Sequence, residues 1–128
     1  MGGLAVLIAS VVTWGVGAAW YGAMARPWQA ASGVTAEEAR AMPRVIYLLG
    51  FACILVVMGF AQWMFYLADV RGTGEGLTTG AMIGGFFVTP WIALNNLYTG
   101  RPVMLTLIDG AYAVLGIAAG GAVLGWLG

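Results

Sequence analysis

Four long runs, almost free of charged residues, constrain this sequence more than any other feature. Each run is long enough to cross ~30 Å of hydrocarbon as a helix that rises ~1.5 Å per residue. Because lipid offers no hydrogen-bond partners, each run must satisfy its backbone groups internally, and a helix does so. We therefore predict an all-α, four-helix integral membrane bundle with spans at about residues 4–24, 45–68, 77–98 and 103–127.

Composition supports a membrane location. Only 8% of the residues are charged and 62% are hydrophobic, whereas a soluble domain carries about 25% charged residues. So few charges cannot cover a surface that faces water. Four short spans leave no room for a second domain, so we expect residues 1–128 to form a single transmembrane domain.

Several classes of function are disfavoured by residues that the sequence lacks. Five arginines balance five acids, so no basic patch is available for nucleic acid. The sequence has no histidine and one cysteine, Cys53, which removes the usual ligands of metals and haem and the usual general base. No nucleophile–base pattern or phosphate-binding loop is present. We expect no metal, no cofactor and no enzymatic activity.

The only long connection, residues 26–44, is expected to lie on the membrane surface. Pro27 should end the first span, because proline cannot continue the backbone hydrogen-bond ladder. Thr35 and Glu38 have the spacing of a capping box, in which each side chain bonds the backbone N–H of the other. This pattern predicts a short helix over about residues 36–42.

The arginines predict the orientation of the spans. Four of them flank the first and third connections, namely Arg26, Arg40, Arg44 and Arg101, whereas Arg71 stands alone in the second. Positively charged residues favour the cytoplasmic side. We therefore expect the first and third connections in the cytoplasm and both termini outside.

Small residues recur at intervals of four in the last two spans. Such spacing lets a second helix backbone approach closely, either within the bundle or from a partner. The positions are Gly80, Gly84, Gly116, Gly120, Gly121 and Gly125.

Asp109 is the only acid inside an apolar run, about 10 Å into its helix at ~1.5 Å per residue. An ionised aspartate at that depth costs a few kcal/mol. It should therefore face the bundle and either be protonated or accept hydrogen bonds from Asn95, Asn96, Thr89 or a tyrosine hydroxyl. The predicted polar cluster comprises Asp109, Asn95, Asn96, Tyr112, Thr89, Trp20 and Tyr21.

Two interpretations of this cluster remain open. Its members could line a binding pocket or a path for ions or protons, which is the default for an acid within the membrane. Alternatively, they could be interhelical hydrogen bonds that hold the bundle together, each contributing roughly 0.6–2 kcal/mol.

Short motifs spread over nearly the whole chain resemble one known family. They include Asn-Asn-Leu-Tyr at 95–98, Gly-Arg-Pro at 100–102, Ile-Asp-Gly-Ala-Tyr at 108–112 and Gly-Ala-Ala-Trp-Tyr at 17–21. The sequence in these respects is similar to the bacterial "domain of unknown function 1761" family of small membrane proteins. The resemblance implies a four-helix protein of a bacterial inner membrane and implies nothing about activity.

Three functional hypotheses follow. The leading one is an accessory or scaffolding subunit that packs its glycine-rich faces against another membrane protein or a second copy of itself. The second is a transporter of small solutes or ions that works as a homo-oligomer. The third is a protein that binds a lipid or isoprenoid, with membrane lipids as its partners.

Overall fold

The computed structural model describes residues 2–128, and its regular elements there are all helices. Four stretches are long and apolar enough to cross a membrane, which confirms the predicted all-α fold with four spans. Along the chain the elements are α1 (Gly3–Ala23), α2 (Ala25–Ser32), α3 (Ala36–Arg40), α4 (Arg44–Leu67), α5 (Thr73–Ile83), the π-helical turn η1 (Gly84–Val88), α6 (Thr89–Tyr98) and α7 (Val103–Leu127).

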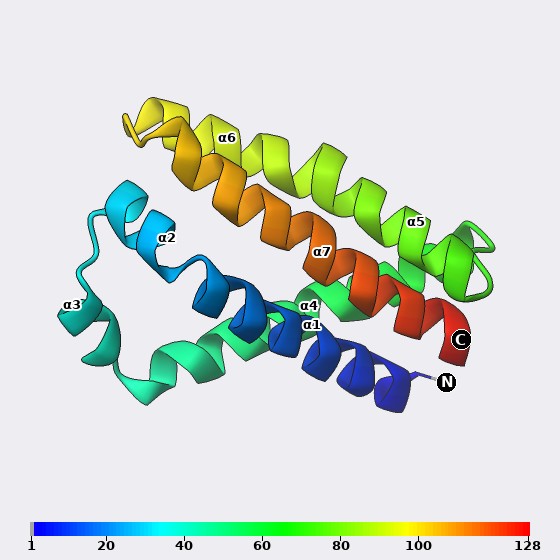
Figure 1. Ribbon diagram of the computed structural model, residues 1–128. Helices are drawn as coiled ribbons and strands as arrows, with labels where there is room; N and C mark the ends of the chain where they lie inside the picture. The colour runs from blue at the N-terminus through cyan, green and yellow to red at the C-terminus, as the bar shows by residue number, and fades with distance from the viewer. Residues whose placement is uncertain (1) are drawn as a thin grey trace.

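Helix α7 is the centre of the bundle. Ten of its residues are buried, against five in α1 and three in α4. The third span, formed by α5, η1 and α6 in line, runs antiparallel along one side of α7, and α1 lies along another side (Figure 1). The connections around α2–α3 and between α6 and α7 lie at one end of the bundle, and both chain termini lie at the other (Figure 1).

Glycines allow α5 and α7 to touch backbone to backbone. A Cβ atom added at Gly76 or Gly80 would collide with the backbone of Gly121 or Ile117. Gly84 of η1 meets the backbone of Ala113 in the same way. The predicted close-packing positions Gly80, Gly84, Gly121 and Gly125 therefore lie in contacts within the chain, where van der Waals packing replaces the hydrophobic effect that lipid cannot supply.

The third span contains a π-helical turn directly before Pro90. Proline has no backbone N–H and cannot donate to the preceding turn. Here the hydroxyl of Thr89 donates to the carbonyl of Gly84 at 2.7 Å, and it also lies 3.2 Å from the carbonyl of Gly110 on α7. The Gly84 carbonyl also accepts the backbone N–H of Thr89, so the hydroxyl adds a second bond there and ties the third span to α7.

The first connection contains more helix than the sequence predicted. Pro27 does not end a helix but sits in the first turn of α2, where prolines are tolerated. The chain instead bends at Met24, between α1 and α2. The capping box of Thr35 and Glu38 is confirmed, with both reciprocal hydrogen bonds present, and the bond from the Thr35 backbone lowers the pKa of Glu38.

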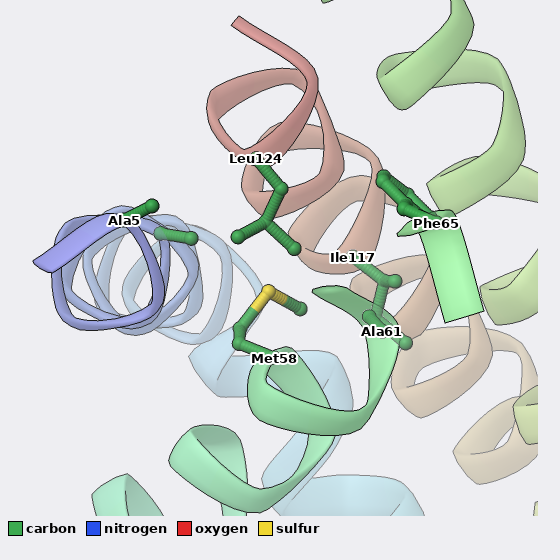
Figure 2. Packing of buried hydrophobic residues seen from close by; sticks show 7 residues of the cluster. Ala5, Met58, Ala61, Phe65, Ile117 and Leu124 are labelled. Carbon is green, nitrogen blue, oxygen red and sulfur yellow. The ribbon is translucent and has the colours of Figure 1, made fainter. Parts of the chain in front are cut away.

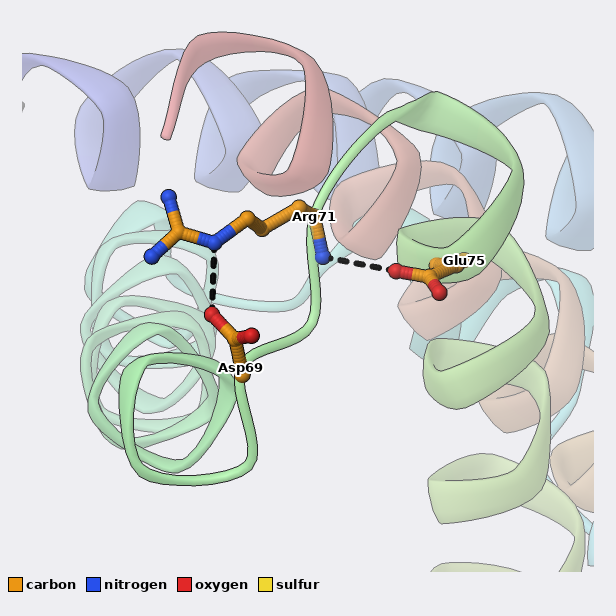
Figure 3. A network of polar contacts seen from close by, with 3 residues as sticks. All are labelled: Asp69, Arg71 and Glu75. Atoms are coloured by element: carbon orange, nitrogen blue, oxygen red, sulfur yellow. Dashed lines mark hydrogen bonds and ion pairs between the residues drawn. The ribbon is translucent and has the colours of Figure 1, made fainter.

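The turn between α4 and α5 is shorter than predicted, because α5 begins at Thr73 rather than near Leu77. Glu75 lies in the first turn of α5, where a negative charge is favoured, and its carboxylate accepts a hydrogen bond from the backbone N–H of Arg71 at 2.9 Å. Arg71 also forms an ion pair with Asp69 at 2.5 Å (Figure 3). The N–H of Gly72 donates to the carbonyl of Gly125, which fixes the turn to the end of α7.

Helix α4 packs against the bundle mainly through its second half, although Phe51 also meets Trp14 of α1 edge to face. Met58, Ala61 and Phe65 are buried and meet Ile117 and Leu124 of α7 (Figure 2). Residues 44–50 at the start of α4, in contrast, are all exposed. The first half of α4 therefore diverges from α1 and α7, which leaves space between them.

The close α5–α7 contact predicts different effects for two neighbouring glycines. A methyl group at Gly84 would meet the backbone of Ala113 and Val114, whereas one at Gly85 would make only an ordinary contact, 3.6 Å from the Val114 side chain. We expect Gly84→Ala to lower the free energy of unfolding by about 1–3 kcal/mol through overpacking. Gly85→Ala should be neutral or slightly stabilising.

Both variants can be compared by thermal unfolding in the same detergent. Equal effects of Gly84→Ala and Gly85→Ala on thermal unfolding would contradict the close backbone contact between Gly84 and α7.

Candidate functional site

A cavity of about 890 Å³ occupies the space left by the diverging half of α4. Ligand sites commonly span about 300–1,000 Å³ and are mostly apolar with few polar groups. The cavity lies between α1, α2, α3, α4 and α7, and we call it the α4 groove. It is bordered by Ala18, Ala25, Ala39, Met42, Gly50 and Ile54 among many other apolar residues, and Asp109 is its only acidic residue.

Asp109 is held by a tyrosine of α1. The hydroxyl of Tyr21 donates to Oδ1 of Asp109 at 2.6 Å, and both side chains are half-buried and border the α4 groove. Oδ2 of Asp109 has no hydrogen-bond partner among residues 2–128 and is not a sealed, buried atom. One carboxyl oxygen is thus occupied by the protein, and the other is free to accept a hydrogen bond from a molecule in the groove.

Tyr112 forms the second contact between α1 and α7. Its hydroxyl donates to the carbonyl of Thr13 at 2.9 Å. Its ring lies so close to Gly17 that a Cβ there would come within 2.8 Å of the ring. The ring also meets Tyr21 edge to face, with centroids 5.4 Å apart. Glycine at position 17 is therefore what allows Tyr112 to lie across α1.

Trp20 and Thr13 complete this interface. The indole N–H of Trp20 donates to the carbonyl of Ile108 at 3.0 Å. The hydroxyl of Thr13 donates to the carbonyl of Gly116 at 3.0 Å. Two adjacent residues of α1, Trp20 and Tyr21, thus donate hydrogen bonds to two adjacent residues of α7, Ile108 and Asp109. In addition, a Cβ at Gly120 would clash with Thr13 and Met58, so Gly116 and Gly120 serve the contacts of α7 with α1 and α4.

The predicted polar cluster divides into two groups. Trp20, Tyr21, Asp109 and Tyr112 come together between α1 and α7. The others lie on the opposite side of α7, where Asn96 donates to the hydroxyl of Thr106 at 2.9 Å and Thr89 faces Gly110. Of the expected partners of Asp109, the structure therefore has a tyrosine and not Asn95, Asn96 or Thr89; the backbone carbonyl of Asn95 accepts from Thr99.

The role of Thr13 in this interface was not predicted from the sequence, although its spacing from other α1 residues indicates it. Three residues of α1 share one helix face with Thr13, because they follow it by four, seven and eight residues, namely Gly17, Trp20 and Tyr21. That face holds every α1 contact described above. The groove itself has no such signal, because it depends on the angle at which α4 crosses the bundle.

The groove presents hydrogen-bonding groups, but its side chains are not grouped as metal ligands. Within residues 2–128, no three or more His, Cys, Asp or Glu side chains cluster in a way that could hold a metal ion. The polar atoms of the groove are instead hydrogen-bonding groups set in an apolar wall.

Four apolar spans, of which α7 is the central one, define a multi-pass helical membrane protein. The family described as "Protein of unknown function (DUF1761)" matches residues 4–125, and the chain belongs to that family. The comparison with curated proteins and the comparison with solved structures each gave no match.

The bond between Tyr21 and Asp109 predicts a specific pattern of stabilities. Tyr21→Phe removes the donor and leaves the carboxyl unpartnered, so it should lower the free energy of unfolding by about 1 kcal/mol. Asp109→Asn should have a smaller effect, because the amide oxygen still accepts from Tyr21. Thermal unfolding in detergent measures both.

Tyr47→Phe provides the matched control. Tyr47 also borders the groove, but it is exposed and its hydroxyl forms no hydrogen bond within residues 2–128. An equal loss from both tyrosine variants would contradict the role given to Tyr21.

Proposed function

We propose that this protein acts by binding and not by catalysis, and that its ligand is a membrane lipid held in the α4 groove. The observation that supports this most is the groove itself, which is apolar along its walls and carries one half-buried acid. A lipid has the matching chemistry, since its chains gain contacts along the apolar walls.

The groove has the right place for such a ligand. It lies between helices that cross the membrane, and its α4 wall begins in the exposed residues 44–50. A lipid can therefore enter sideways from the bilayer without passing through water. Trp14 and Tyr47, which border the groove, add aromatic surface for the chains.

The hypothesis of an accessory subunit has less support. It rested on glycine faces that pack against a partner, yet these glycines are occupied by contacts between α7 and its own neighbours. A partner or a second copy of the chain would need a different surface. Transport is a further prediction that nothing in the groove specifically favours.

Filling the groove tests lipid binding. Gly50 borders the groove and has no atom within 4 Å of where its Cβ would lie, so Gly50→Phe should fit without a clash and occupy ligand space. We expect it to reduce the lipid that copurifies with the protein, measured by native mass spectrometry from mild detergent.

Gly59→Phe is the control. Gly59 is on the same helix and is equally free of neighbours, but it does not border the groove. Unchanged lipid occupancy in Gly50→Phe, or an equal loss in Gly59→Phe, would exclude the α4 groove as the binding site.

We further propose that the protein lies in a bacterial inner membrane with α2, α3 and the α6–α7 turn in the cytoplasm. Four of the five arginines lie in these segments or at the first residue of α4, which supports the assignment. In a Cys53→Ser background, Ala41→Cys should react with a membrane-impermeant maleimide only after cells are permeabilised. Thr73→Cys should react in intact cells, and the reverse pattern would invert the orientation.

A further inference from the structure

Three arginines stand close in sequence to residues that border the α4 groove, at the end of the bundle that holds α2 and α3. Arg26 follows the groove residue Ala25, Arg40 follows Ala39, and Arg44 comes two residues after Met42. All three side chains are exposed, and none forms an ion pair within residues 2–128. The three belong to α2, α3 and α4, which all contribute residues to the groove.

Acidic residues do not neutralise this end of the bundle. Four arginines face only Glu37 and Glu38 there. The carboxylate of Glu38 accepts from the Thr35 backbone in the capping box. At the opposite end, two acids surround a single arginine, and that arginine is already paired (Figure 3). The groove therefore has an apolar interior, and the end of the bundle beside its rim carries an excess of positive charge.

We infer that the lipid in the α4 groove is an anionic phospholipid, with its phosphate at Arg26, Arg40 and Arg44 and its chains along the apolar walls. This inference rests on the proposed lipid-binding function. Guanidinium groups suit phosphate because their planar, fork-like donors can pair with two of its oxygens. Deeper in the groove, Asp109 offers a phosphate no cation, so the head group stays at the rim.

The depth of the groove is consistent with this placement. Asp109 is seven residues beyond Pro102, which precedes the first residue of α7, or about 10 Å at ~1.5 Å per residue. The arginines lie outside the four spans or at the first residue of α4. Charged head group and apolar chains would thus occupy the same levels in the protein as they do in the surrounding bilayer.

The test is a competition between two lipids. The full-length protein is reconstituted in nanodiscs with equal amounts of phosphatidylglycerol and phosphatidylcholine that carry identical chains. It is then released, and its bound lipid is measured by native mass spectrometry. We expect phosphatidylglycerol to be enriched over its share in the nanodisc. The double variant Arg40→Gln/Arg44→Gln should lose this preference, by about fivefold for each arginine, and should still bind lipid.

Two controls separate this site from general attraction to a charged surface. Arg101→Gln removes a charge at the same end of the bundle, but its neighbours Gly100 and Pro102 do not border the groove. Arg71→Gln removes the paired arginine at the other end. Both should keep the preference for phosphatidylglycerol.

The outcomes distinguish the two proposals. Bound lipid with no preference, or an equal loss of preference in Arg101→Gln, would overturn the inferred head group and leave lipid binding intact. If no lipid is retained by the unmodified protein, the proposed function fails as well. A preference abolished only by the rim arginines supports the inference.

Discussion

The backbone contact between α5 and α7 is the interaction on which the rest of the bundle depends. Gly76, Gly80 and Gly84 place no side chain between the third span and α7, so that the two backbones touch. In lipid, helices associate through close packing and interhelical hydrogen bonds, because burial from water no longer drives them together. The third span thereby fixes α7 on one side and leaves its other faces for α1 and α4.

The second interface works by a different principle. Helices α1 and α7 are joined by side-chain hydrogen bonds from Thr13, Trp20, Tyr21 and Tyr112, most of them to backbone carbonyls. Only one of these bonds involves an ionisable acceptor, Asp109. Asp109 is thus a structural partner of Tyr21 through Oδ1, and its Oδ2 is left without a partner within residues 2–128.

Much of the fold could be predicted from the sequence, because the long apolar runs and the glycine spacing act locally. The capping box of Thr35 and Glu38 is equally local. Helix α2 could not be predicted, since Pro27 can stand either after a helix or in the first turn of the next. The pairing of Asp109 with Tyr21 needed knowledge of which helix lies beside α7, and the groove needed the crossing of α4. These are properties of tertiary packing that no short motif contains.

The π-helical turn at Gly84–Val88 determines which residues of the third span face α7. Residues that face α7 occur four apart from Gly76 to Gly84, but the next one, Thr89, comes after five. Asn96, seven residues later, meets α7 again at Thr106. Since an α-helix turns about 100° per residue, a regular α-helix of the same sequence would place Thr89 about 140° away from Gly84. The wider π-helical turn takes up the extra residue, so that Thr89 and Asn96 still face α7. The third span thus tolerates one residue more than regular helical spacing without losing its contacts with α7.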